Sequence, residues 1–233
     1  MKYTVKPEVF DLNPDLCFGI IIARGLKNTA TTEAEMDRLT KAQVQARAVI
    51  PADALKTQPI IAGYRQVLEK AGINPNKYVN SMEAMMKRIL KGGDLPSINS
   101  LVDLCNSISI ENQVSLGGHD LADIKADLSV QYTGGGEKFL PFGASEYEIV
   151  EPGELVFTSG NVVQTRKWVW RQSELGKMTL DTREVFFQLV GFDCHPGSPL
   201  ASAMDALEEV LHQKCEGSIK RYIVTKDQPE IEF

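Results

Sequence analysis

The chain has 233 residues, of which 43% are hydrophobic and 24% are charged, and its formal net charge is −6. This length and composition predict a soluble globular protein, and we expect residues 1–233 to form a single domain. No window approaches the roughly 18 continuous apolar residues of a membrane span, and the first ten residues lack the apolar run of a signal peptide, so we expect a cytoplasmic protein with no membrane partner.

The acidic balance also limits the nucleic acids that the chain could bind. A protein that grips nucleic acid without sequence specificity usually carries a basic surplus. Any nucleic-acid contact must therefore be local, through a small basic patch, and we expect no binding to DNA.

The cysteine pattern indicates packed thiols in a reducing compartment. Cys17, Cys105, Cys194 and Cys215 lie far apart and form no CxxC pair. Zinc sites built from thiolates usually need clustered ligands. Asp193-Cys194-His195 is the one short run with metal-binding side chains, but it has no fourth ligand nearby. We predict no metal and no cofactor.

The first half of the chain is mostly helical in pattern. The apolar run Phe18 to Gly25 predicts a buried strand. Apolar residues then recur at helical spacing, and Asn80 with Glu83 three residues later suits a helix start. A further helix closes the chain before a last strand over 219–225. The predicted helices span residues 31–50, 59–71, 80–91, 98–110 and 199–215.

After Gly117-Gly118, which we expect to form a turn, apolar residues alternate with polar ones. This dense series of short strands indicates an antiparallel sheet, so the predicted fold class is α+β, with helices packed on a mostly antiparallel sheet. The predicted strands cover residues 128–132, 138–140, 146–150, 154–158, 162–165, 168–172, 178–180 and 185–190.

Asn106 is the first candidate site residue. It lies four residues after Val102 and therefore on the same side of its helix, and Ser109 falls within the apolar stripe. Polar groups on an inward edge need partners. Either these two side chains satisfy a buried backbone turn, or Asn106 faces a cavity and hydrogen-bonds a ligand.

Both tryptophans of the chain lie in the segment Trp168 to Gln172. On a strand, Trp168, Trp170 and Gln172 would face one way and Arg171 the other. One interpretation is a core tryptophan pair with a solvated basic edge. The other makes Trp168, Trp170 and Gln172 a pocket wall, and Arg171 then either contacts phosphate outside the pocket or lies next to the pocket through a bulge.

Two further sets of residues have a structural and a functional interpretation. Lys87, Arg88 and Lys91 form either a solvated helix face or a small patch that contacts phosphate. His119 and Asp120 either cap the segment after them, or His119 serves as an acid or base. No GxSxG or HExxH motif is present, which disfavours an α/β-hydrolase or a metalloprotease.

The stretch from Asp94 to Asn106 resembles the helix of the B-three/B-four domain, the tRNA-editing domain of the phenylalanyl-tRNA synthetase beta subunit. The resemblance extends from about Lys77 to Phe192, whereas residues 1–76 match less well. It is closer still to free-standing relatives of that domain. The residues that carry the resemblance are Gly117-Gly118-His119-Asp120, GGEKFLPFG from Gly135 to Gly143, Pro152-Gly153-Glu154 and Asp181-Thr182-Arg183, and for the free-standing group Lys77-Tyr78, Ser81, Glu83, Arg88 and Trp168 to Gln172.

This resemblance implies a pocket for the aminoacyl end of a tRNA, lined by Asn106, with Gly117 and Gly118 among the substrate-binding residues. The tRNA contacts that it implies are Lys87, Arg88 and Lys91. Synthetase domains, which remove wrongly attached tyrosine, usually place a histidine at the position of Gly117 or Gly118 and a glutamate at that of Gln188. They also have a glycine-rich wall where this chain has Trp168 to Gln172. The usual acid–base pair is thus missing, and the bulkier wall predicts a smaller or reshaped pocket.

Three functions remain open at this stage. The first is a trans-acting aminoacyl-tRNA deacylase, in which Asn106 and Gln188 position water or the substrate amine. The second is a non-catalytic module that binds free amino acid or tRNA. The third is another hydrolase or amide-bond enzyme that reuses the pocket. All three require Asn106 and the tryptophans to face one common cavity.

Overall fold

The structure, a computed structural model, describes residues 1–233. Its predicted helices are confirmed close to their predicted ends. Side chains close their first turns: Asn80 Oδ1 accepts from the Glu83 N–H at 2.8 Å, and Thr32 forms a capping box with Glu35. The helices are α1 (Pro7–Phe10), α2 (Glu33–Val49), α3 (Pro59–Lys70), α4 (Ser81–Leu90), α5 (Ser100–Asn112) and α6 (Pro199–Lys214), with 3₁₀ segments η1 (Ala52–Thr57) and η2 (Leu121–Asp123).

The strands form two sheets. The four-stranded sheet has the order β11-β2-β10-β3, and the eight-stranded sheet has the order β12-β1-β4-β7-β8-β5-β6 with β9 beside β8. Only β1–β4 and β5–β8 pair in parallel, so the predicted α+β fold with a mostly antiparallel sheet is confirmed. The strands are β1 (Lys2–Val5), β2 (Cys17–Leu26), β3 (Ser115–Asp120), β4 (Leu128–Tyr132), β5 (Glu137–Phe139), β6 (Glu148–Val150), β7 (Leu155–Ser159), β8 (Val162–Arg166), β9 (Arg171–Gln172), β10 (Glu184–Gly191), β11 (Cys215–Val224) and β12 (Glu230–Glu232).

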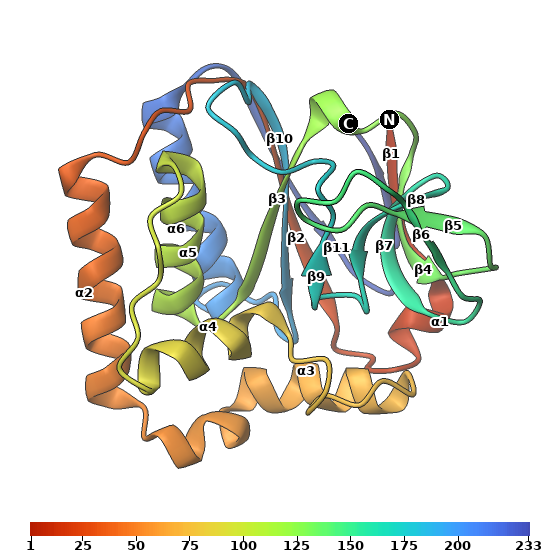
Figure 1. Cartoon of the computed structure of the whole chain (residues 1–233), viewed down its shortest axis with the longest axis horizontal. Helices are drawn as coiled ribbons and strands as arrows, with labels where there is room; N and C mark the ends of the chain where they lie inside the picture. Colours follow the sequence, from red (N-terminus) through yellow and green to blue (C-terminus); the bar gives the residue numbers. More distant parts are fainter.

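These elements make three layers (Figure 1). Helices α2, α5 and α6 lie on one side of the four-stranded sheet, the eight-stranded sheet lies on its other side, and α3 and α4 run across one end. Side chains along β10 alternate between the two sides. Phe187 and Leu189 pack in the cluster with α5 and α6, whereas Phe186 and Val190 pack in the cluster with the other sheet. Gln188 therefore points toward the space between the two sheets.

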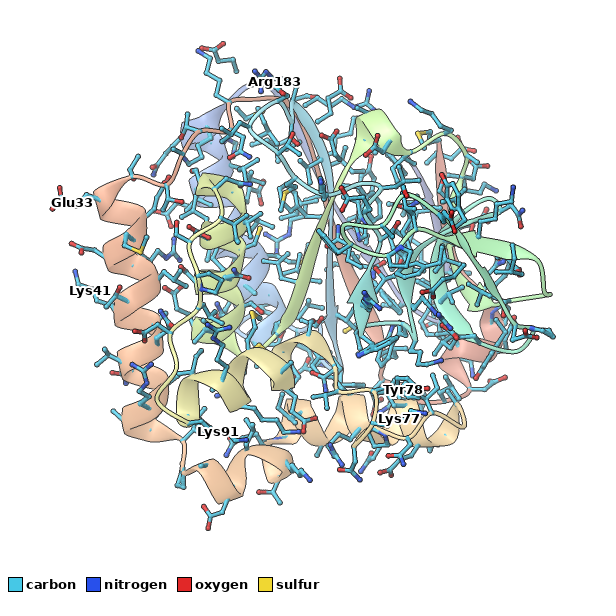
Figure 2. The ribbon with its side chains drawn as sticks, in the orientation of Figure 1. Glu33, Lys41, Lys77, Tyr78, Lys91 and Arg183 are labelled. Carbon is cyan, nitrogen blue, oxygen red and sulfur yellow. The ribbon has the colours of Figure 1, made fainter.

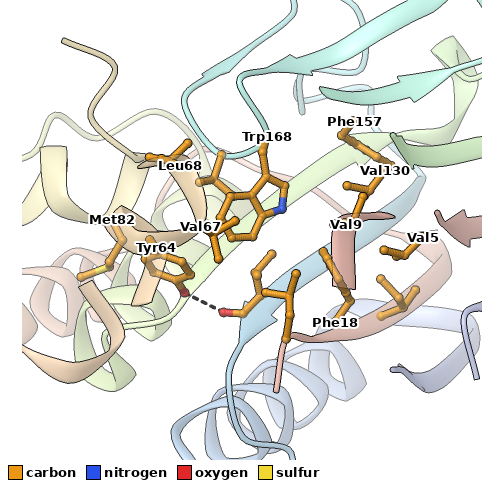
Figure 3. Packing of buried hydrophobic residues seen from close by; sticks show 14 of the residues in the cluster. Val5, Val9, Phe18, Tyr64, Val67, Leu68, Met82, Val130, Phe157 and Trp168 are labelled. Carbon is orange, nitrogen blue, oxygen red and sulfur yellow. Dashed lines mark hydrogen bonds between the residues drawn. The ribbon is translucent and has the colours of Figure 1, made fainter. Parts of the chain in front are cut away.

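Trp168 is a core residue of this inter-sheet space (Figure 3). It is 1% exposed and lies between Tyr64 of α3, whose ring meets it edge-on at 6.0 Å, and Phe157 of β7. Burying an indole removes on the order of 200 Å² from water, about 5 kcal/mol, although its N–H has no partner here, which offsets part of that. The core interpretation therefore holds for Trp168. Trp170 is only half-buried.

Three local predictions are wrong because distant partners satisfy the backbone. Gly117-Gly118 belong to β3, paired along β10, and do not form a turn. Trp168 is in a tight turn with φ of 64°, held by its N–H bond to the Leu155 carbonyl at 2.8 Å, so only residues 171–172 are strand. Residues 178–180 form a loop, in which the Met178 and Thr179 carbonyls accept hydrogen bonds from asparagine side chains and not from a neighbouring strand.

None of the helices is both long and apolar enough to cross a membrane.

Candidate functional site

The site begins with the pairing of β3 and β10. Gly117 lies directly opposite Gln188, and Gly118 lies opposite Phe187. Because side chains alternate along a strand, Gly117 and His119 share the face of β3 that looks toward the eight-stranded sheet. Two of the predicted site residues from distant parts of the chain, His119 and Gln188, therefore lie on one side of the same sheet.

A cavity of about 100 Å³ opens on this face, which we call the His119 pocket. It brings together six predicted site residues: Gly117, His119, Trp168, Trp170, Gln172 and Gln188. Ser81, which begins α4 and which the family resemblance had marked, also lines it. Sequence reasoning missed three further polar or aromatic contributors: Ser115 begins β3, Thr165 lies on β8, and Tyr3 reaches Gln188 from β1. No local pattern marked these three, because each is an ordinary residue at an element end or on a strand.

His119 is oriented between Gln172 and Gly117. Its Nδ1 lies 3.5 Å from Gln172 Nε2, and a Cβ built on Gly117 would lie 3.8 Å from its Nε2. The ring is 3% exposed and packs edge-on against Phe157, and this burial lowers its pKa to about 4. His119 is therefore a neutral imidazole at pH 7, with one nitrogen directed to the place where Gly117 has no side chain.

Gln188 is held by a single buried hydrogen bond. Tyr3 donates its hydroxyl proton to Gln188 Oε1 at 2.9 Å. Burial keeps the Tyr3 pKa well above its usual range, so the phenol remains a donor. The Gln188 Nε2 group donates to no protein acceptor and is available to a ligand in the His119 pocket.

Asn106 lines a second, neighbouring cavity of about 280 Å³, which we call the Asn106 pocket. This pocket lies between α5 and β3 and contains Gly118 and Phe142. The two pockets share Leu116, Gly117 and Gln172 as walls. The predicted common cavity is thus found as two adjoining cavities with shared walls, because β3 runs between them, and Asn106 and the tryptophans do not lie in separate packed regions.

Gln172 stands at the boundary of the two pockets. Its Nε2 donates to the Gly118 carbonyl at 3.0 Å, on the open edge of β3. Ser109, also on α5, donates to the Val114 carbonyl at 2.5 Å. Its side chain therefore satisfies a buried backbone turn, the first of the two interpretations given above. Asn106 makes no such backbone bond and is half-buried at the pocket wall.

Larger cavities lie elsewhere in the molecule. One of about 340 Å³ lies beside α3, and one of about 630 Å³ opens between α2 and α6. Neither contains a predicted site residue. The His119 pocket is distinguished by its chemistry, since it combines a neutral imidazole, a free amide donor and serine and threonine hydroxyls.

The basic residues predicted to contact tRNA lie outside both pockets. Arg171 is exposed on β9. Lys87 pairs with the buried Glu83 at 2.8 Å, and Arg88 donates to the Asp94 carbonyl at 2.7 Å. Lys91 is exposed at the end of α4, and Figure 2 shows it well separated from Lys77.

No group of three or more His, Cys, Asp or Glu side chains is placed to hold a metal ion. In the Asp193–His195 loop, Asp193 Oδ1 instead accepts from the His195 backbone N–H at 2.9 Å. The Asp120 side chain caps η2 by accepting from the Ala122 N–H, as its structural interpretation requires.

The chain was compared with curated proteins, solved structures and protein families. A search of curated proteins gave no match. Among solved structures, the chain is similar to an N-terminal fragment of the phenylalanyl-tRNA synthetase beta subunit from Pyrococcus horikoshii, with 14% identity and a TM-score of 0.45. That match covers 95% of this chain and 53% of the other, so this chain spans about half the length of the fragment. The profile of the B3/4 domain matches residues 63–196, and the chain therefore belongs to the B3/4 domain family.

Proposed function

We propose that this protein hydrolyses the ester bond of an aminoacylated tRNA, with the aminoacyl group in the His119 pocket. The observation that carries the proposal is the position of His119 Nε2 beside Gly117 and, across the β3–β10 pair, near Gln188. The family resemblance puts a histidine at Gly117 or Gly118 and a glutamate at Gln188. Here the imidazole comes from two residues further along the same face of β3.

The chemistry needs little beyond a positioned water. The neutral His119 Nε2 can accept a proton as water attacks the ester carbonyl carbon, although the burial that lowers its pKa to about 4 also makes it a weaker base than an exposed imidazole. It then returns that proton to the ribose oxygen when the C–O bond breaks, which releases the amino acid and the tRNA hydroxyl. The free Gln188 Nε2 group is placed to hold the water or the developing oxyanion, a contribution of about 10²–10³ in rate.

The pocket volume favours a small amino acid. At about 100 Å³ the His119 pocket is smaller than the adjoining Asn106 pocket of about 280 Å³, and Trp168, Trp170 and Gln172 wall it in. We therefore expect a small side chain to be preferred over an aromatic ring. Asn106, in the adjoining pocket, is then left to contact the parts of the substrate beyond the ester.

The test is deacylation of a panel of tRNAs charged with small and with aromatic amino acids. Hydrolysis of a small aminoacyl ester is expected, and replacing His119 by Gln should slow it by about 10²–10⁴. His195→Gln, the same change at an exposed histidine, is the matched control and should keep full activity. No deacylation of any aminoacyl-tRNA at micromolar protein would rule the proposal out.

One observation favours a second candidate, a non-catalytic module that binds an amino acid or charged tRNA. Gln188 is an amide locked to Tyr3, so it cannot take up a proton as a glutamate would. Calorimetry with free amino acids and a non-hydrolysable aminoacyl-adenosine separates the two candidates. Binding without turnover of the matching ester identifies the module.

A further inference from the structure

A group of aromatic and basic side chains adjoins the His119 pocket through Trp170, one of the residues that line it. The rings of Tyr78 and Trp170 meet edge-on with centroids 4.9 Å apart. The Nζ atoms of Lys77 and Lys167 lie 5.1 Å and 4.4 Å from the centroid of the Tyr78 ring. We call these four residues, with Arg171 next to Trp170, the Tyr78 cluster.

The cluster has free positive charge. Lys77 and Arg171 are exposed and pair with no carboxylate. Lys167 shares Glu154 with Arg166, at 2.7 Å for each contact. On Glu154, burial acts to raise the pKa, but the hydrogen bonds from Arg166 and Lys167 outweigh it and lower the pKa, so this carboxylate remains occupied by its own cations.

The cluster is also continuous with the pocket. Trp170 lines the His119 pocket, and the Ser81 N–H donates to the Val169 carbonyl at 2.9 Å, which joins the start of α4 to the tryptophan turn. Lys77 and Tyr78 lie together just before that start, in the connection from α3 (Figure 2). A substrate chain that leaves the pocket past Trp170 therefore meets the cluster first.

We propose that the Tyr78 cluster binds the single-stranded 3′ end of an RNA, with a base stacked on Trp170 and phosphates at Lys77 and Arg171. Aromatic faces interleaved with cations are how proteins bind single strands without sequence readout. Tyr78 packs against Trp170 with its ring at 74° to the indole and is itself contacted by two ammonium groups. The inference rests on the proposed function for the choice of RNA, and it moves the contact away from Lys87, Arg88 and Lys91.

The chain offers a direct readout of stacking, because it has only two tryptophans. Replacing the core residue Trp168 by Phe leaves Trp170 as the single indole fluorophore. Titration with a short single-stranded RNA is expected to quench its emission. If that variant does not fold, the indole N–H signals of the unaltered chain in NMR spectra report the same event, with Trp170→Phe used to assign them.

Binding should depend on the cluster and on salt. Trp170→Ala is expected to weaken RNA binding at least about fivefold. Lys77→Ala and Arg171→Ala should each weaken it and each lower the slope of log K against log salt by about 0.7. Lys91→Ala, the same charge change at the far end of α4, is the matched control and should leave affinity and slope unchanged.

Several results would overturn the inference. These are RNA binding that leaves Trp170 emission unchanged, equal losses in Lys91→Ala and Lys77→Ala, or equally tight binding of polyglutamate, which carries negative charge without bases. The proposed hydrolysis is separable, because it can be assayed on an amino-acid methyl ester without RNA. Ester turnover without quenching of Trp170 emission would rule out only the proposed RNA contact. Quenching without turnover of any ester would rule out only the proposed hydrolase activity.

Discussion

The hydroxyl of Tyr3 donates a 2.9 Å hydrogen bond to Oε1 of Gln188, although the two residues are 185 positions apart. Tyr3 lies on β1 of the eight-stranded sheet and Gln188 on β10 of the four-stranded sheet. The bond thus joins the two sheets next to the His119 pocket. It also sets which end of the Gln188 amide faces a ligand.

Tyr3→Phe tests this contact. The substitution keeps the ring but leaves Gln188 Oε1 buried without its donor, which should lower the free energy of unfolding by about 1–3 kcal/mol. Urea unfolding at neutral pH measures the change. Tyr132→Phe is the control, since the Tyr132 hydroxyl is only partly buried and forms no hydrogen bond to the protein. Equal stability of Tyr3→Phe and the unaltered chain would contradict the structural role.

Tyr64 closes the end of the β3–β10 pair. Its hydroxyl donates to the Val190 carbonyl at 2.6 Å and accepts from the Ser115 N–H at 2.8 Å (Figure 3 draws the first bond). Tyr64→Phe leaves both buried backbone groups unpaired and should cost about 2–4 kcal/mol in urea unfolding. Hydrogen exchange should show faster exchange at Ser115. If Tyr64→Phe lost no more unfolding free energy than Tyr132→Phe, the Val190 carbonyl and the Ser115 N–H would have to find other hydrogen-bond partners.

The buried His119 predicts a specific dependence of stability on pH. Its pKa is about 4 in the folded chain against an ordinary 6.5, so between these values the unfolded chain binds more protons. The contribution of His119 to the free energy of unfolding is thus present above pH 6.5 and is lost progressively as the pH falls to about 4. The full loss corresponds to about 3 kcal/mol.

His119→Gln isolates this contribution. Urea unfolding at several pH values should show a steeper fall from pH 6.5 to 4 for the unaltered chain than for the variant. Glu35, whose pKa is lowered to about 2 because hydrogen bonds from Lys214, Thr32 and Ser100 outweigh its burial, acts in a more acidic window. Parallel curves for the two proteins above pH 4 would show that His119 is not buried as a neutral ring.

Two adjacent glycines give a matched pair of variants. A Cβ on Gly117 would lie 3.8 Å from its nearest neighbour, His119 Nε2. One on Gly118 would lie 2.7 Å from Sδ and Cε of Met178, a flexible side-chain end that can move, and 3.1 Å from Cε1 of the buried Phe187 ring. Gly117→Ala should therefore keep its unfolding free energy within about 0.5 kcal/mol, and Gly118→Ala should lose about 1 kcal/mol. Because the added methyl enters a small pocket, Gly117→Ala should still slow ester hydrolysis. If Gly117→Ala were the less stable of the two variants, the assignment of Gly117 to the open face of β3 and of Gly118 to its packed face would be wrong.

Local sequence patterns predicted the helices well and the strands less well. Asn80, three residues before Glu83, caps α4 where the pattern placed it, because capping depends on neighbours along the chain. The Gly117-Gly118 pair predicts a turn but forms strand, because its conformation depends on β10, a partner far along the chain. Trp168 lies in a predicted strand but forms a turn, which is held by Leu155 and by the start of α4.

The candidate site, like the fold, was only partly predictable from the sequence. His119, Gln188, Trp170 and Gln172 were singled out from the sequence and the structure gathers them at one pocket, but their roles stay predictions. Asn106 lies across β3 in an adjoining pocket, which helical spacing alone does not reveal. Tyr3 carried no signal at all. That residues 1–233 form one domain also stays a prediction.

By itself, the amino-acid order determined the α+β class, the capped helices and the membership of the B3/4 family, since these depend on periodicity, caps and short motifs within local stretches. Only the tertiary structure decided that His119 takes the space beside Gly117, that Tyr3 orients Gln188 and that β3 divides one expected cavity into two. Such contacts depend on register between strands distant in the chain, which no short window of residues encodes.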